Sequence, residues 1–167
     1  MTDQSNNDPS GSSRRIAGRP ARWESRSATV QFACDERVRA LMAEAGHPEV
    51  RSVHGYVFQH LLTGPVRITD LAGLLGMTPQ GASKVAAEME RIGYVTRKVS
   101  GEDQRVRAIE LTQRGHEAIE AGRTARRSVT EELLAGLPEP EPFLDALDTL
   151  SDRTGALRDL MARRLRP

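Results

Sequence analysis

The segment from Thr78 to Ile92 separates polar and basic residues from apolar ones when it is read at about 100° per residue. Polar, small and basic side chains fall on one side: Gln80, Lys84, Ala87 and Arg91, with Ser83 on the flank. Apolar side chains fall on the other: Ala82, Val85, Ala86, Met89 and Ile92. Glutamine and serine near a helix N-terminus can hydrogen-bond to base edges or phosphates, and lysine can neutralise a phosphate. The pattern indicates a helix with one core face and one face that either binds nucleic acid or is an ordinary solvated surface.

The next basic residues lie around a predicted turn. Residues 94–99 are rich in β-branched side chains, 100–103 carry turn chemistry, and 105–111 resume a strand pattern, so we expect a two-stranded hairpin. Four basic residues lie near its tip: Arg97, Lys98, Arg105 and Arg107. Asp103 precedes Arg105 closely enough to hold its guanidinium in one orientation, which suits a narrow, electronegative minor groove. Solvated arginines are the ordinary alternative on a hairpin.

Two short helices are predicted to position these groups. The first opens at Thr69, whose hydroxyl can accept an amide of the first turn, has Asp70 where the helix dipole favours an anion, and ends at Gly76. The second has Thr78 as its N-cap and Pro79 at its first position. Helix, glycine-containing turn and helix is the helix-turn-helix order, in which the second helix enters the major groove by its N-terminal residues.

The run from residue 71 to 115 resembles the winged helix-turn-helix of the MarR-type transcriptional regulators. Three pieces carry the resemblance: Gly93-Tyr94-Val95 after the second helix, Asp103-Gln104-Arg105 in the wing, and Leu111-Thr112-Gln113-Arg114-Gly115 at the start of the next helix. Their combined spacing is fairly specific, and the resemblance covers roughly residues 66–122. Ala86 and Ala87 replace the bulkier residues often found in the middle of the second helix, which leaves the depth of groove insertion open.

The resemblance implies a homodimeric repressor or activator, with a repressor as the first expectation. Its second helices would enter successive major grooves of a roughly palindromic operator, and its wings would reach the flanking minor grooves. It assigns DNA contact to matching positions: Thr78, Pro79, Gln80, Ser83 and Lys84 in the helix, and Asp103 and Arg105 in the wing. Arg91, Arg97 and Arg107 complete the predicted DNA-binding set by their charge and position.

Signal sensing is also implied, because proteins of this type often bind a small, frequently aromatic molecule between the dimer and DNA-binding regions. His54, Tyr56 and His60 lie where such a cleft would be, although buried polar residues satisfied by their neighbours are the simpler interpretation. Some relatives sense peroxides through a cysteine of the first helix, the position of Cys34 here. Its apolar neighbours more often indicate a buried, inert thiol.

We expect a mainly α fold with a small β-wing, in which a winged helix-turn-helix is flanked by N- and C-terminal dimerisation helices. Residues 1–26 are predicted to be a disordered basic tail, and 27–65 to form two helices, 27–46 and 49–63, for dimerisation and ligand binding. Residues 66–111 are the DNA-binding region, beginning with a short strand at 66–68. Residues 112–167 are predicted to be dimerisation helices, the last running from 143 to 161.

Composition bounds the other possibilities. A net charge of +1 argues against non-specific binding along nucleic acid. Any binding to nucleic acid must therefore depend on local basic patches. One cysteine, no long apolar run and no leader pattern predict a cytoplasmic protein without a membrane span. We expect no enzyme activity, metal or cofactor, since no catalytic, phosphate-binding or metal-ligand spacing is present. The main alternative is a winged helix that binds a protein, for which a basic wing would not be needed.

Overall fold

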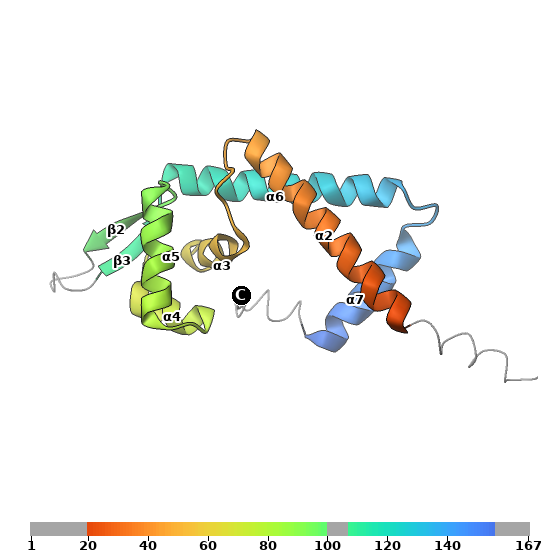
Figure 1. The fold of residues 1–167 in the computed structure, drawn as a ribbon, viewed down its shortest axis with the longest axis horizontal. Helices are drawn as coiled ribbons and strands as arrows, with labels where there is room; N and C mark the ends of the chain where they lie inside the picture. Colours follow the sequence, from red (N-terminus) through yellow and green to blue (C-terminus); the bar gives the residue numbers. More distant parts are fainter. Residues whose placement is uncertain (1–19, 100–106, 156–167) are drawn as a thin grey trace, which may run out of the picture. The chain divides into compact units, whose positions relative to one another are not determined.

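The computed structural model describes residues 20–99 and 107–155, and its elements are drawn in Figure 1. The chain divides into two compact units, Met1–Arg37 and Val38–Pro167, and helix α2 (Pro20–Glu44) runs from the first into the second. In chain order the other elements are α3 (Ser52–Leu61), β1 (Val66–Arg67), α4 (Ile68–Leu75), α5 (Pro79–Arg91), β2 (Val95–Val99), β3 (Arg107–Leu111), α6 (Gln113–Ala135) and α7 (Glu141–Thr154). The predicted fold class, mainly helical with a small β-wing, is confirmed.

Helix α2 begins earlier than the sequence predicts. Residues 20–26, which we expected in a disordered tail, are helical instead. Pro20 suits the first position of a helix, because an N–H there would have no partner inside the helix. Val30 and Phe32 in this helix are exposed, so its apolar residues are not all covered within the chain.

The sheet holds the wing against the helices. Its three antiparallel strands have the order β1-β3-β2, with Val66 opposite Ile109 and Val95 opposite Leu111. The predicted short strand before the helix-turn-helix therefore closes against the wing, as expected. Ile109, in the central strand, is fully buried.

Strand β1 also explains a correction to the start of α4. The helix begins at Ile68 with Arg67 as N-cap and no side-chain cap, so Thr69 lies inside the first turn and is not the predicted cap. Because β1 runs directly into the helix, the strand pairing decides where the helix starts. The predicted end is confirmed: Gly76 is left-handed (φ 65°), and its N–H donates to the carbonyls of Ala72 and Gly73.

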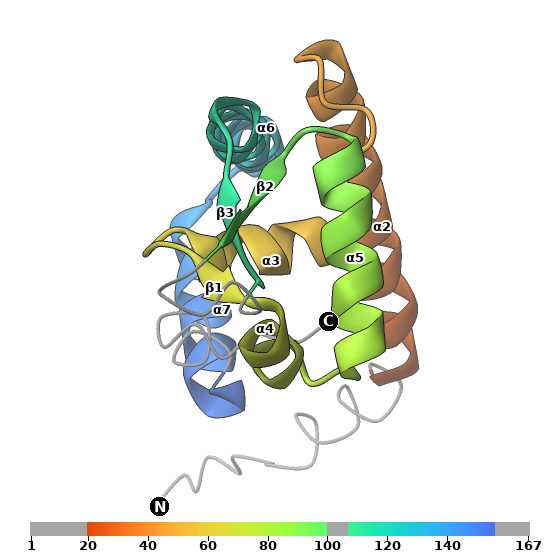
Figure 2. The same ribbon diagram turned by 90° about the vertical axis from the view of Figure 1, so that its left-hand side faces the viewer.

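The helices and strands of the second unit share one hydrophobic core. Helix α3 contacts α4, α5, β3 and α6, and Figure 2 shows it lying behind α5 and the hairpin. The core residues are contributed by all these elements: Val57, Phe58, Leu61, Leu71, Leu75, Ala86, Met89, Tyr94, Val95, Ile109, Ala118 and Ile119. Helix α5 is thus backed by packed apolar side chains along one side.

Hydrogen bonds join the two ends of the hairpin, where the Gly93-Tyr94-Val95 piece meets the piece that begins at Leu111. The Oγ1 of Thr112, the N-cap of α6, accepts from the N–H of Gly115 (3.1 Å) and donates to the carbonyl of Gly93 (2.6 Å). The backbone N–H of Thr112 donates to the carbonyl of Tyr94 (3.1 Å). The Leu-Thr-x-x-Gly piece therefore locks the base of the wing to the start of α6.

The C-terminal helix carries exposed apolar side chains. None of the residues of α7 is buried, and Phe143, Leu147 and Leu150 are 40–47% exposed. The helix ends at Thr154, where Gly155 is left-handed. The remainder of the predicted helix, to residue 161, lies outside the described residues. Among residues 20–99 and 107–155, no helix is long and apolar enough to span a membrane.

Candidate nucleic-acid interface

The start of α5 is set by local capping. Thr78 is extended at the N-cap, its Oγ1 accepts from the N–H of Gly81 (3.1 Å), and Pro79 is at the first helical position, as the sequence predicts. The cap satisfies one of the amides that the first turn leaves without a helical partner. The N-terminal turn of α5 is therefore well ordered for presentation to a ligand.

The two faces of α5 differ in burial as predicted. Ala82, Ala86 and Met89 are fully buried in the core, and Val85 is half-buried. The residues that point away from the core are all exposed: Gln80, Ser83, Lys84, Ala87 and Arg91, preceded by the exposed Thr78 and Pro79. We call these seven residues the outer face of α5.

The outer face keeps its positive charge. Within residues 20–99 and 107–155, neither Lys84 nor Arg91 forms an ion pair. The carboxylates of α5, Glu88 and Glu90, are instead engaged with residues of α3 and β2. A face with free cations beside hydrogen-bonding side chains can bind phosphates and base edges.

Two basic side chains in the described part of the wing form ion pairs within the domain. The Nε of Arg97 lies 3.0 Å from Oε2 of Glu90, and Nζ of Lys98 lies 2.8 Å from Oε2 of Glu110. Both charges are therefore balanced by carboxylates. Of the four basic residues from which the sequence favoured DNA over a protein partner, Arg97 and Lys98 are thus not free cations. Asp103 and Arg105 lie outside the described residues, as does the side chain of Arg107.

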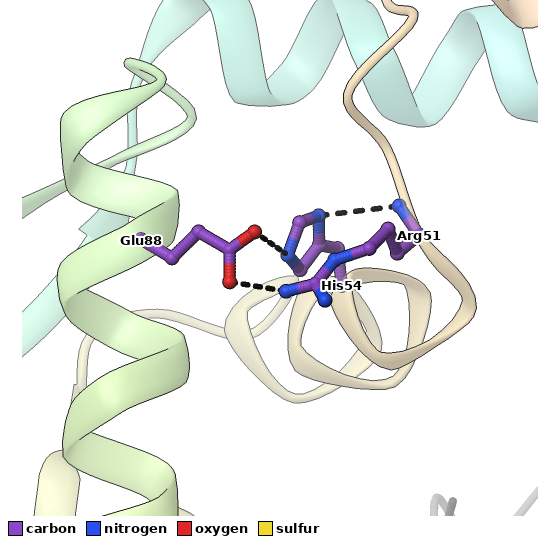
Figure 3. Close-up of polar contacts among 3 residues, drawn as sticks. All are labelled: Arg51, His54 and Glu88. Atoms are coloured by element: carbon purple, nitrogen blue, oxygen red, sulfur yellow. Dashed lines mark hydrogen bonds and ion pairs between the residues drawn. The ribbon is translucent and has the colours of Figure 1, made fainter.

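A cluster that sequence reasoning missed connects α5 to α3, and Figure 3 shows its three side chains. Glu88 of α5 forms an ion pair through Oε2 with Arg51, the N-cap of α3, and its Oε1 lies 3.8 Å from Nε2 of His54. The Nδ1 of His54 accepts from the backbone N–H of Arg51 (3.2 Å). A histidine at the third position of a helix signals such a cap, but nothing local points to a carboxylate 34 residues further on.

The environment of His54 keeps its ring neutral. The side chain is fully buried, and this burial lowers its pKa below the ordinary histidine value. The charge of Arg51 acts in the same direction, and that of Glu88 opposes both. His54 is therefore an uncharged link in the interior at neutral pH.

The other predicted sensor residues are also inside the fold or partly so. His60 is buried, and Tyr56 is half-buried and packs against the core. Cys34, a half-buried free cysteine, lies in the part of α2 that belongs to the first unit. Among the described residues, no group of histidine, cysteine and acidic side chains could hold a metal ion.

Comparison with known proteins agrees with this geometry. Residues 39–106 match the model of the MarR family. No curated protein sequence matches the chain.

Solved structures share the fold over most of the chain. The YusO protein of Bacillus subtilis has a TM-score of 0.64 and 19% identity, covering 91% of this chain and 99% of its own. A mutant of S. aureus MepR bound to an oligodeoxyribonucleotide has a TM-score of 0.55 and 24% identity, covering 81% and 94%. Streptococcus pneumoniae FabT in complex with DNA has a TM-score of 0.58 and 18% identity, covering 82% and 97%. Residues 39–106, which include α5 and strand β2, are thus similar to the MarR family, and the chain has the same winged helix-turn-helix fold as these solved structures.

Proposed function

We propose that the protein is a sequence-specific DNA-binding transcriptional repressor that binds a roughly palindromic operator as a homodimer. The observation that carries this proposal is the outer face of α5, which is exposed and carries hydrogen-bonding side chains. Within residues 20–99 and 107–155, its Lys84 and Arg91 form no ion pair with a carboxylate. DNA-bound proteins of the same fold, MepR and FabT, support it.

Local charge favours DNA over a protein partner. The chain carries a net charge of only +1, so its affinity for DNA must come from a concentrated basic surface rather than from overall charge. The first turn of α5 adds backbone amides and a helix dipole that attract phosphate. Gln80 and Ser83, next to these amides, supply the groups that distinguish bases. A protein-binding helix would have no use for this combination.

The partner in the dimer is a second copy of this chain. Large apolar side chains remain exposed on α2, α6 and α7 or between them: Val30, Phe32, Leu133, Leu137, Phe143, Leu147 and Leu150. Soluble chains cover such surfaces by association, most often in two-fold dimers. A two-fold dimer would place two α5 helices on successive turns of one DNA face, which explains a palindromic site.

DNA binding is tested by selecting duplexes from a random pool and titrating the best one with wild type and three variants. We expect Lys84→Ala to lower the slope of log affinity against log salt by about one, and Gln80→Ala to relax base preference. Arg127→Ala removes an exposed arginine of α6 and serves as the charge-matched control, with an unchanged slope. No preference for any duplex over random competitor, or a monomer in sedimentation equilibrium, would overturn the proposal.

The wing is tested in the same titration. Arg105→Ala is expected to weaken specific binding by about 1–3 kcal/mol if the arginine enters a minor groove. Unchanged affinity would remove Arg105 and its neighbour Asp103 from the mechanism.

Release by a small aromatic ligand completes the proposal. Its support is the family match together with Tyr56, the half-buried aromatic residue among the predicted sensors. A panel of phenolic acids should contain a compound that lowers DNA affinity for wild type and does so less for Tyr56→Ala. If no compound in the panel changes DNA affinity, this part of the proposal fails.

The redox alternative predicts a different result. If Cys34 senses peroxide, peroxide will release wild-type protein from DNA but not Cys34→Ser. We expect no release, because Cys34 is half-buried and is the chain's single cysteine, so no disulfide can form within one chain.

A further inference from the structure

We propose that the cluster of Arg51, His54 and Glu88 sets the orientation of α5 on the rest of the domain, and that His54 is a positioning residue for DNA binding. The inference rests on the proposed function, since DNA affinity is one of its readouts. No sequence motif or family resemblance singled out this cluster as a unit.

Glu88 is well placed to control the outer face. It lies one helical turn after Lys84 and one turn before Arg91, on the flank between the outer face and the core. Its side chain is about one-third exposed, so it borders both surfaces. A rotation of α5 that moved the outer face would have to move Glu88 with it.

The carboxylate lies against one neighbouring helix at two points, of which only the ion pair with Arg51 is a bond in this structure. One oxygen pairs with the guanidinium of Arg51 and the other faces the ring of His54, as Figure 3 shows. A single ion pair to a flexible arginine leaves a helix free to turn, because the arginine follows it. The buried imidazole cannot follow, since it is packed and its other nitrogen accepts from the backbone of Arg51 (3.2 Å).

The proton of His54 is on the nitrogen that faces Glu88. In a neutral imidazole one nitrogen donates and the other accepts. Because Nδ1 accepts from the N–H of Arg51, the proton must be on Nε2, 3.8 Å from Oε1 of Glu88. That separation is longer than a hydrogen bond, and an approach of α5 to α3 by roughly 1 Å would form one. The arrangement favours one docked position of α5 over others.

A second carboxylate holds the other flank of the helix. Glu90 is two residues from Glu88, which places it about 200° round the helix, and it pairs with Arg97 of β2 at 3.0 Å. Helix α5 is therefore held by α3 on one side and by the wing on the other. This fits a helix that must be presented to DNA at a defined angle.

Two substitutions at His54 separate the contacts of its two nitrogens. The Oδ1 of His54→Asn lies near the position of Nδ1, so it can still accept from Arg51 but cannot reach Glu88. The amide of His54→Gln lies near the position of Nε2, so it can still donate to Glu88 but cannot cap α3. Both variants remove an imidazole from the core, and His54→Asn loses one methylene more than His54→Gln.

We expect His54→Asn to weaken binding of the selected duplex by about tenfold or more while random-sequence binding is nearly unchanged, and His54→Gln to stay within about threefold of wild type. Glu88→Gln, a change outside the core, should resemble His54→Asn. In the free protein, the ¹⁵N shifts of the imidazole should show Nε2 protonated and Nδ1 unprotonated. Amide hydrogen exchange in α5 should be faster in His54→Asn than in His54→Gln.

The outcomes separate this inference from the proposed function. If wild type binds no duplex specifically, the proposed function fails, while the imidazole shifts and the exchange rates of α5 still decide whether His54 holds the helix. If wild type binds specifically but His54→Asn binds as tightly as His54→Gln, this inference alone is wrong. Equal losses of affinity in both variants, or a proton on Nδ1, would also overturn it, since the role of His54 would then be only structural.

Discussion

Replacing Gly115 with alanine should destabilise the protein, although alanine is the better helix former. A Cβ at this position would lie 2.3 Å from the carbonyl oxygen of Tyr94 and 3.1 Å from Cδ2 of Leu111. The carbonyl cannot move aside easily, because it accepts from the N–H of Thr112 at the base of the wing. The close approach explains why the Leu-Thr-x-x-Gly piece ends in glycine.

The size of the effect follows from two opposing terms. Overpacking against a fixed group costs about 3 kcal/mol at the upper end of its usual range, which a 2.3 Å contact with backbone justifies. The gain in helix propensity from glycine to alanine is about 1 kcal/mol. The free energy of unfolding should therefore fall by about 2 kcal/mol, which lowers Tm by roughly 4–8 °C for a chain of this size.

Gly73→Ala is the matched control. Gly73 is exposed inside α4, and a Cβ there would meet nothing within 4 Å, so alanine should stabilise the protein by about 0.5–1 kcal/mol. Both variants are compared with wild type by thermal and urea unfolding at one protein concentration, because the proposed dimerisation would make Tm concentration-dependent. If Gly115→Ala proves as stable as wild type, the contact between Gly115 and Tyr94 is not a constraint and the argument is refuted.

Three further predictions concern the cap, the core and the buried histidines. Thr78→Ala should lower the free energy of unfolding by about 0.5–2 kcal/mol through loss of the α5 cap, and Thr78→Ser should restore it, as measured by urea unfolding. Met89→Ala should lower it by about 2–5 kcal/mol because the side chain is fully buried; a smaller loss would mean that the core collapses around the site. Burial lowers the pKa of both His47 and His54, so the unfolded chain binds protons more readily. The contribution of these two histidines to the free energy of unfolding should be fully present above the ordinary histidine pKa of about 6.5. It should be lost as pH falls through their lower folded pKa values. Urea unfolding across this range should show the free energy of unfolding falling with pH, and His54→Asn should reduce that slope.

Local signals in the sequence were sufficient to predict α5 and its faces. The capping side chain of Thr78, the fixed φ of Pro79 and the spacing of the apolar residues act within one or two turns, so they need no knowledge of the rest of the chain. The hairpin strands were predicted for the same reason. The exposed and buried sides of α5 thus follow from sequence alone.

The first and last residues of a helix were harder to predict where contacts with another element determine them. Thr69 has the chemistry of a helix cap, but pairing of Val66–Arg67 with β3 lets α4 begin at Ile68, two residues before the start that a cap at Thr69 would give. The left-handed Gly155 ends α7, although the apolar pattern continues beyond it. Periodicity reports which residues share a face, not where the helix stops.

The charges around α5 show what only the tertiary structure could decide. From the sequence, Arg97 was a free cation of the wing and His54 a candidate ligand contact. The fold pairs the first with Glu90 and places the second against Glu88 and Arg51, while it leaves Lys84 and Arg91 open to solvent. Capping and periodicity depend on neighbours within one element, whereas these pairs form between side chains of different elements, which only the fold brings together. Which of the described cations stay exposed and unpaired is therefore a property of the packed domain.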